Sequence, residues 1–369
     1  MDYASRRGRI YDWMQAERID AAYLTSDADI RYLTGMPNDS VLLLFANEKS
    51  TLVPWDIHLA QELANADEIV PYTSFDRNLD KTLGSLFVEA GIGGGMRIEA
   101  PEATAFPTAA RLSAVLEPAE FICRTDGLDA KIRELRAVKD EDEIALIIRA
   151  ASIANDILET LIDNLESGFQ DETEVAHFIE AEAISSGAES VGFPTIVAGH
   201  DRSHGIHAFP GYGVAPIGSA GFTIIDFGVR VGGYTSDATL AALFGDPTQS
   251  QRKMLNLVQE AYDMSIDRLA PGVDARSIAG EVESLFGSAG YSMPHSLGHG
   301  IGLEVHEAPW LRSAGGEPSP LEPGMVFTIE PGLYDPTEGG VRLENDVVIA
   351  SSGVTIITNS RIVQFPDSR

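Results

Sequence analysis

The spacing of apolar positions along the chain predicts two regions of different architecture. Residues 6–19 carry apolar positions at the spacing of one helix face, whereas residues 41–48 contain a continuous apolar run typical of a buried strand. Because such segments alternate over the first third of the chain, we expect an α/β layer there. The expected strands cover 21–25, 41–48, 50–55 and 96–100, and the expected helices cover 6–19, 60–64 and 79–90.

A long helix is predicted to open the second region. Asp140 can cap its first turn, and Glu143, three residues later, can reach back to the backbone of the cap. Apolar residues then recur with helical spacing at Ile144, Ile148, Ala151 and Ile157. A boundary shortly before this helix divides the chain into domains 1–133 and 134–369.

The second domain mixes helical patterns with predicted β hairpins, a combination typical of an α+β domain. The expected helices cover 172–187, 250–270 and 274–290. The expected strands cover 195–199, 221–228, 325–333, 341–350 and 353–359. The chain is therefore predicted to be α+β, with a smaller α/β domain in front of a larger C-terminal domain.

The charge of the chain narrows the range of partners. Among its 369 residues, 56 are acidic and 26 are lysine or arginine, which gives a net charge of -30. This excess argues against nucleic acids and anionic membranes as partners, since both are bound through basic patches. The acids also repel one another. Salt weakens this repulsion beyond a distance of about 10 Å at 0.1 M and about 3 Å at 1 M. We therefore predict a halophilic source organism.

Cysteine usage and hydropathy indicate the compartment. The chain has a single cysteine, Cys123, so it cannot form an intramolecular disulfide, which fits a reducing cytoplasm. No stretch approaches the roughly 18 consecutive apolar residues of a membrane span. The first residues also lack a recognisable export signal. We expect a cytoplasmic protein without a membrane partner.

Two predicted β ribbons in the second domain each carry a pair of acids beside apolar runs. Asp226 and Asp237 are separated by a glycine turn, and so are Glu330 and Glu344. Four like charges in a low-dielectric core are tolerable only if protons or cations neutralise them. The pattern therefore favours bound cations.

Histidines are concentrated in the same domain, and three of them lie in the stretch HSLGHGIGLEVHE, residues 295–307. Four carboxylates and one imidazole suit two divalent ions roughly 3.5–4 Å apart. Such ions lower the pKa of a bound water towards about 7 and polarise a carbonyl, which is the chemistry of metal-assisted hydrolysis. The remaining histidines can hydrogen-bond a substrate or transfer protons. We expect the glycines of this stretch to let the backbone approach the metals.

The motifs IDFGVRVGGYTSD, GHGIGLEVHE, TIEPG and GVRLEND, in this order, resemble those of the pita-bread-fold dinuclear metallopeptidases. The similarity is to the branch of the Xaa-Pro dipeptidases (prolidases) and aminopeptidase P. It covers the second domain, and the first domain resembles the creatinase-like N-terminal domain of that branch. It implies a pita-bread catalytic domain and a homodimer. It also implies hydrolysis of the bond before proline in dipeptides or short peptides by a hydroxide that bridges two metal ions.

The resemblance also implies roles for individual residues. The implied metal ligands are Asp226, Asp237, His299, Glu330 and Glu344, with Asp237 and Glu344 bridging two divalent ions and Glu330 also acting as acid and base. Mn or Co is favoured as the metal, and Zn or Fe stays open. The implied substrate-side residues are His207, His295, His306 and Arg342.

Two departures from the family pattern surround the expected substrate pocket. The family has a histidine somewhat closer to the first ligand aspartate, whereas His207 stands nineteen residues before Asp226 and His204 is nearby. We choose His207 and leave His204 open. The usual Glu-Asp pair of the last motif is Glu344-Asn345-Asp346 in this chain. Three other functions remain: hydrolysis of a small, ectoine-like C–N compound on the same scaffold, a lyase acting on a small sulfonium compound, and a binding module without catalysis.

Overall fold

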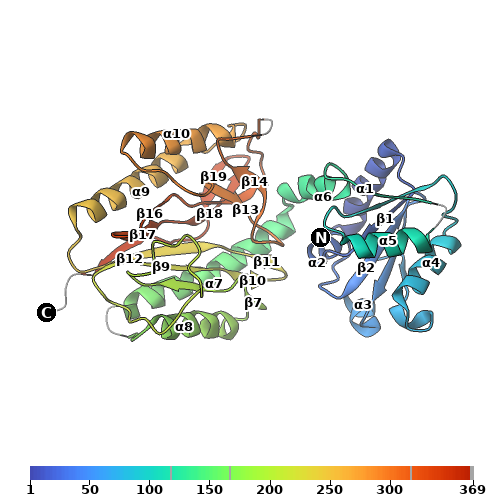
Figure 1. Cartoon of the computed structure of the whole chain (residues 1–369), viewed down its shortest axis with the longest axis horizontal. Helices are drawn as coiled ribbons and strands as arrows, with labels where there is room; N and C mark the ends of the chain where they lie inside the picture. Colours follow the sequence, from blue (N-terminus) through green and yellow to red (C-terminus); the bar gives the residue numbers. More distant parts are fainter. Residues whose placement is uncertain (117–118, 166–167, 316–317, 366–369) are drawn as a thin grey trace. The chain divides into compact units, whose positions relative to one another are not determined.

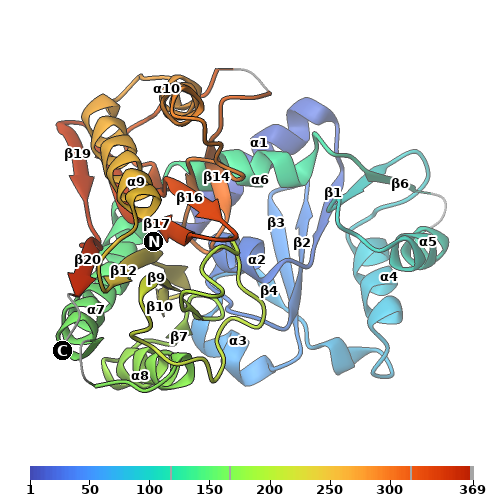
Figure 2. The same cartoon turned by 60° about the vertical axis from the view of Figure 1, so that its left-hand side comes forward.

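The chain folds into two compact units, Met1–Arg136 and Ala137–Arg369. The structure is a computed structural model that describes residues 1–116, 119–165, 168–315 and 318–365. The division between the units lies near the end of α6 (Leu128–Ala137), whereas the sequence pattern placed it after residue 133. Figures 1 and 2 label the elements of both units.

The first unit is built on a mixed sheet of six strands in the order β4-β3-β2-β1-β5-β6. The four strands predicted from the sequence are present, but β4 and β6 were not expected because they are short and incompletely buried. The bounds are β1 (Ala21–Leu24), β2 (Ser40–Phe45), β3 (Lys49–Pro54), β4 (Glu68–Ile69), β5 (Arg97–Ala100) and β6 (Glu120–Cys123).

Helices of the first unit accompany this sheet, and their apolar faces join its core. Three of them, α2, α5 and α6, were not predicted, and each spans only eight to ten residues. The core includes Leu43, Phe87 and Ile98. The helices are α1 (Tyr3–Glu17), α2 (Asp27–Thr34), α3 (Ile57–Leu63), α4 (Leu79–Glu89) and α5 (Phe106–Val115), with a short 3-10 turn at Tyr72–Ser74.

The second unit begins with α7 (Glu141–Leu165), and its N-terminal cap is as predicted. The Glu143 amide donates to the Asp140 carboxylate and the Asp140 amide to the Glu143 carboxylate, each at 2.9 Å. The predicted buried face is partly wrong: Ile148 is 46% exposed, whereas Ile147 is fully buried. Because residues 146–148 are all apolar, the sequence did not show which of them faces the core.

Two nested hairpins form the centre of the second unit. The outer strands β9 (Gly221–Phe227) and β12 (Ala238–Phe244) pair antiparallel, and the chain between them forms the small hairpin of β10 and β11. The same arrangement recurs with β15 (Val326–Ile329) and β18 (Asn345–Ala350), which enclose the hairpin of β16 and β17. The inner strands are β10 (Val229–Val231), β11 (Tyr234–Thr235), β16 (Gly332–Asp335) and β17 (Gly339–Arg342).

The breaks between outer and inner strands correct two sequence predictions. The expected continuous strands 325–333 and 341–350 are each two strands, interrupted at Glu330-Pro331 and at Leu343-Glu344. Pro331 has no amide hydrogen, so the chain can leave the outer ladder there without losing a backbone bond. These interruptions hold two of the predicted metal-binding acids, Glu330 and Glu344.

The outer hairpins belong to different sheets, ordered β20-β12-β9-β8 and β14-β13-β15-β18-β19. A bridge between Thr239 and Glu344 connects them. Helices α7 and α8 pack against Ile225, Phe227 and Ala242, whereas α9 and α10 pack against Phe222 and Leu243. The two helix pairs thus lie on opposite sides (Figures 1 and 2). The other elements are α8 (Glu172–Ser185), α9 (Gln249–Arg268), α10 (Ala275–Ser288), β7 (Ser190–Val191), β8 (Ile196–Ala198), β13 (Gly298–Gly300), β14 (Glu307–Leu311), β19 (Gly353–Ile356) and β20 (Ile362–Phe365).

Hydropathy of the helices bears on the membrane prediction. Among the helices that the structure describes, none combines the length and the apolar character needed to cross a bilayer.

Candidate metal centre and substrate cavity

A cavity of about 650 Å³ in the second unit gathers the residues singled out from the sequence. Its lining includes all five predicted metal ligands, Asp226, Asp237, His299, Glu330 and Glu344. It also includes the predicted substrate-side residues His207, His295, His306 and Arg342. Among the described residues that line it, His207 is present and His204 is not.

Three of the predicted ligands meet closely. Asp237, His299 and Glu344 each offer a ligand atom, and these atoms lie within 4.8 Å of one another. The Nε2 atom of His299 is 3.9 Å from Asp237 Oδ2 and 3.5 Å from Glu330 Oε1. Because the acids come from the breaks in both nested hairpins, the fold brings together side chains more than a hundred residues apart.

Burial and mutual repulsion dominate the electrostatics of the acids. Burial, with Glu344 and Asp226 adding to it, raises the pKa of Asp237 well above its usual range. Burial followed by repulsion from Glu344 does the same to the pKa of Glu330. Burial and Asp226 raise the pKa of Glu344 to about 7. Without a cation these groups therefore retain protons near neutral pH.

The donor atoms fit divalent cations. Within the described part of the chain, Asp226 Oδ1 and Asp237 Oδ1 are buried and have no hydrogen-bond partner. The His299 Nδ1–H donates to the Gly300 carbonyl at 3.3 Å, which leaves the lone pair of Nε2 facing the acids. Burial lowers the pKa of His299 to about 3, so the imidazole is neutral and can bind a metal. Carboxylate oxygens and one imidazole suit divalent ions of the first transition row.

Arg342 links the acids to the rest of the cavity. It is buried, and its Nη2 donates to Asp226 Oδ2 at 2.5 Å. Its Nε donates to Thr239 Oγ1 at 3.0 Å, and the Thr239 hydroxyl donates to Glu344 Oε2 at 2.6 Å. The arginine thus fixes two of the predicted ligands, one directly and one through a hydroxyl.

Tyr334 belongs to the site but was not predicted. Its hydroxyl lies 2.9 Å from both Arg342 Nη1 and His295 Nε2. Because His295 Nδ1 donates to the Ser296 carbonyl at 2.8 Å, its Nε2 accepts from the tyrosine. Burial lowers the pKa of His295 to about 4 and raises that of Tyr334 to about 12, so both are neutral. The one signal for Tyr334 in the sequence was its position four residues after Glu330. It was missed because Tyr334 lies on β16, which the pattern of apolar positions did not separate from β15.

Aromatic and apolar side chains complete the cavity. The His306 ring lies 4.3 Å from the His299 ring, centroid to centroid, and is parallel to the ring of Trp310. Burial lowers the pKa of His306 as well. The apolar lining is formed by Phe193, Pro194, Ile196, Ile206, Phe209, Val305 and Trp310. An apolar ligand with one polar end would therefore fit beside the acids.

The glycines around His299 have a different role from the one expected. A Cβ atom at Gly298 would lie 1.9 Å from the Thr328 carbonyl oxygen, and one at Gly300 would lie 2.1 Å from the Ala308 carbonyl oxygen. Neighbouring strands, rather than metal ions, thus require residues without a Cβ here. The close packing of β13 between β14 and β15 holds the His299 side chain in the cavity.

Comparison with known proteins assigns the class. Residues 145–351 match the metallopeptidase family M24, and residues 6–138 match the creatinase/prolidase N-terminal domain. The chain belongs to this family of metallopeptidases, and its second unit is the pita-bread catalytic domain. The predictions of fold and enzyme class are confirmed.

The most informative relatives are peptidases that match over nearly their whole length. The chain is 32% identical to a Xaa-Pro dipeptidase of Pyrococcus horikoshii, over 95% of this chain and 96% of that protein. The crystal structure of the prolidase from Pyrococcus horikoshii OT3 superposes with a TM-score of 0.84 at 28% identity, covering 97% and 99% of the two chains. For the Xaa-Pro dipeptidase from Bacillus anthracis the TM-score is 0.87 at 28% identity, with 99% and 100% covered.

Proposed function

We propose that the protein is a Xaa-Pro dipeptidase that uses two divalent metal ions, Mn or Co in the first place and otherwise Zn or Fe. The observation that carries this proposal is the convergence of five predicted ligands in one cavity, with atoms of Asp237, His299 and Glu344 within 4.8 Å of one another. The named relatives support a dipeptide or short peptide with proline after the scissile bond. They favour a peptide over the ectoine-like compound and over a binding module without catalysis.

In this proposal the four carboxylates and His299 would hold the ions. When bound, such ions make hydroxide available near neutral pH and polarise the carbonyl that it attacks. Glu330 is the one acid of the set beside His295, with its Oε2 3.7 Å from His295 Nδ1. It would accept the proton of the attacking water and pass it to the proline nitrogen that leaves.

The histidines would act as hydrogen-bonding groups. His295 receives its orientation from Tyr334 and from the Ser296 carbonyl. His306 and His207 line the same cavity and can donate to the carbonyl or carboxylate of a dipeptide. The apolar wall around Phe193 and Trp310 would cover the proline ring or the preceding side chain and exclude water.

Metal content and turnover test this function together. Protein stripped with a chelator and reloaded with Mn should bind two ions per chain and hydrolyse Xaa-Pro dipeptides but not Xaa-Ala dipeptides. Glu344→Gln should bind less metal and lose activity, because a bridging carboxylate would be replaced by an amide. Glu322→Gln is the control, since Glu322 is exposed and outside the cavity lining. Full metal binding by Glu344→Gln, or no turnover of any Xaa-Pro peptide, would contradict the proposal.

Assembly and compartment stay predictions. The resemblance implies a homodimer, and the single cysteine fits the cytoplasm. Light scattering on the metal-loaded protein would give the mass of the assembly directly, and a monomer would contradict the first of these predictions.

A further inference from the structure

The segment between β8 and β9 shapes one wall of the cavity with very little regular structure. We call residues 199–213 the His207 loop; Ile206, His207, Phe209 and Gly211 from this loop line the cavity. A loop without a strand or helix of its own holds a side chain in place only if other groups fix its backbone. The Val197 amide of β8 donates to the Gly211 carbonyl at 2.8 Å, and two further sets of contacts involve side chains.

The base of the loop is fixed by one buried carboxylate. Glu172, the first residue of α8, is fully buried. Its Oε1 accepts from the amide of Gly199 at 2.8 Å, and its Oε2 accepts from the amide of Gly213 at 2.8 Å. A single side chain thus binds the first and the last residue of the His207 loop.

Arg202 connects the same carboxylate to the interior of the loop. Its Nη1 forms an ion pair with Glu172 Oε2, and its Nη2 donates to the carbonyl of Pro210. The charge of Glu172 is thereby compensated in a buried place, where an unpaired carboxylate would be costly. Thr173 adds a bond from its hydroxyl to the Gly213 carbonyl at 2.7 Å.

The far side of the loop is attached to the hairpin that carries Arg342. The Gly340 amide donates to Ser203 Oγ at 3.0 Å, and Arg342 Nη1 donates to the carbonyl of Ile206 at 3.0 Å. His207 directly follows this anchored carbonyl. The loop is therefore held between the catalytic hairpin on one side and Glu172 with Arg202 on the other.

We infer that Glu172 and Arg202 are positioning residues that set the place of His207 relative to the metal centre. Neither of them lines the cavity among the described residues, so they act through the loop. Glutamine cannot replace Glu172, because both glycine amides and the guanidinium are donors and an amide offers one acceptor oxygen in place of two. The inference rests on the proposed role of His207 in peptide hydrolysis.

Hydrogen exchange and kinetics of the metal-loaded protein test the inference. In Glu172→Gln, amide exchange should accelerate in peptides from residues 199–213, with metal content unchanged. The kcat/KM for a Xaa-Pro dipeptide should fall by at least about tenfold, within the roughly 100-fold that a misplacement of about 1 Å can cost. When His207 is already replaced by alanine, Glu172→Gln should lower kcat/KM by less than about twofold, because Glu172 acts through His207. Arg202→Lys, which keeps the charge but shortens the reach to Pro210, should give a smaller effect of the same kind.

Glu159→Gln is the matched control, since it breaks the pair of Glu159 with Arg361 (2.7 Å) on α7, away from the loop. It should change neither loop exchange nor kcat/KM. Unchanged exchange of the His207 loop in Glu172→Gln overturns the inference, as do kinetic losses that add to those of His207→Ala. If the parent protein fails to hydrolyse any Xaa-Pro peptide, the proposed function fails, and the exchange experiment still decides whether Glu172 holds the loop.

Discussion

At the scale of single residues, the choice between His207 and His204 is open to a direct test. Both lie on the same exposed loop, and His207 lines the cavity. We predict that His207→Ala lowers kcat/KM by about 100-fold, the lower end of what the loss of one hydrogen-bond donor to a reacting carbonyl costs. His204→Ala should stay within about twofold of the parent. Steady-state kinetics with equal metal loading measures both, and the reverse order would mean that His204 faces the substrate.

The meeting of Asp226, Asp237, Glu330 and Glu344 in one cavity could be predicted from the sequence, because an acid beside an apolar run is costly without a cation. Tyr334 and Thr239 could not, since a buried hydroxyl leaves no comparable trace in a pattern of apolar and polar positions. Their roles depend on contacts to Arg342 across separate strands, at 2.9 Å and 3.0 Å. The role of Glu172 could not be predicted either, because its partners are backbone amides of a loop that is distant in the sequence.

At the scale of elements, β13 tolerates little change in its backbone. Gly300 has no space for a Cβ, because the Ala308 carbonyl oxygen would be 2.1 Å away and belongs to the backbone. We predict that Gly300→Ala destabilises the protein by about 3 kcal/mol and lowers metal content, since His299 must shift with its strand. Thermal melting and metal analysis would show both effects.

Gly287 in α10 provides the control for that substitution. A Cβ there would meet nothing within 4 Å. Gly287→Ala should leave metal content unchanged and raise stability by about 0.5–1 kcal/mol, because alanine is the better helix former. If Gly287→Ala and Gly300→Ala lost stability and metal content equally, strand packing around His299 would not be the cause of the loss.

The prediction of elements succeeded where the sequence carries a local signal. The capping box of Asp140 and Glu143 fixed the start of α7, and the glycine turns indicated the hairpins. The breaks at Glu330 and Glu344 were missed, because pairing with separate partners divides the strands there, and such pairing leaves no local signal in the sequence. Tertiary contacts decided these boundaries.

At the scale of the whole molecule, removal of metal should change how stability depends on pH. Folding raises the pKa of Asp237, Glu330, Glu344 and Asp346, so these four acids bind more protons in the metal-free fold than in the unfolded chain. They outnumber His295, His299 and His306, whose lowered pKa values act in the opposite sense below about pH 6.5. The contribution of the acids is present below the usual carboxyl pKa of about 4 and is lost as pH rises through the folded values, about 7 for Glu344. The metal-free protein should therefore melt at a lower temperature at about pH 8 than at about pH 5.5.

Metal should oppose this loss, because ions that bind only the folded state stabilise it by mass action. The difference in melting temperature between Mn-loaded and chelator-treated protein should accordingly grow with pH. A difference that shrinks from acid to neutral pH would contradict a site made of buried carboxylates.

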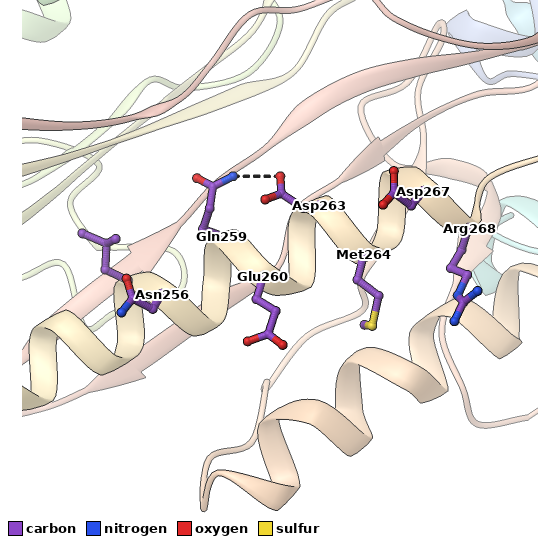
Figure 3. A pocket seen from close by; sticks show the side chains of 8 residues that line it. Asn256, Gln259, Glu260, Asp263, Met264, Asp267 and Arg268 are labelled. Carbon is purple, nitrogen blue, oxygen red and sulfur yellow. Dashed lines mark hydrogen bonds between the residues drawn. The ribbon is translucent and has the colours of Figure 1, made fainter.

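The acidic surface leads to a prediction about salt. The exposed side of α9 illustrates it: Glu260, Asp263 and Asp267 line a hollow with Arg268, and Gln259 donates to Asp263 at 2.9 Å (Figure 3). With a net charge of -30, repulsion among such groups should destabilise the fold in dilute buffer. The melting temperature should therefore rise between low salt and molar KCl. A melting temperature that stays constant or falls as the KCl concentration rises would contradict the prediction of a halophilic source.

The duplicated hairpins make the active centre dependent on the meeting of two halves of the domain. Asp226 and Asp237 come from the first ribbon and Glu330 and Glu344 from the second, and the bridge from Thr239 to Glu344 ties the ribbons together at that point. A nascent polypeptide that has emerged only as far as β12 possesses half of the acids. The full set of proposed ligands exists only once the second ribbon has docked, so we expect metal binding to follow the folding of the whole second unit.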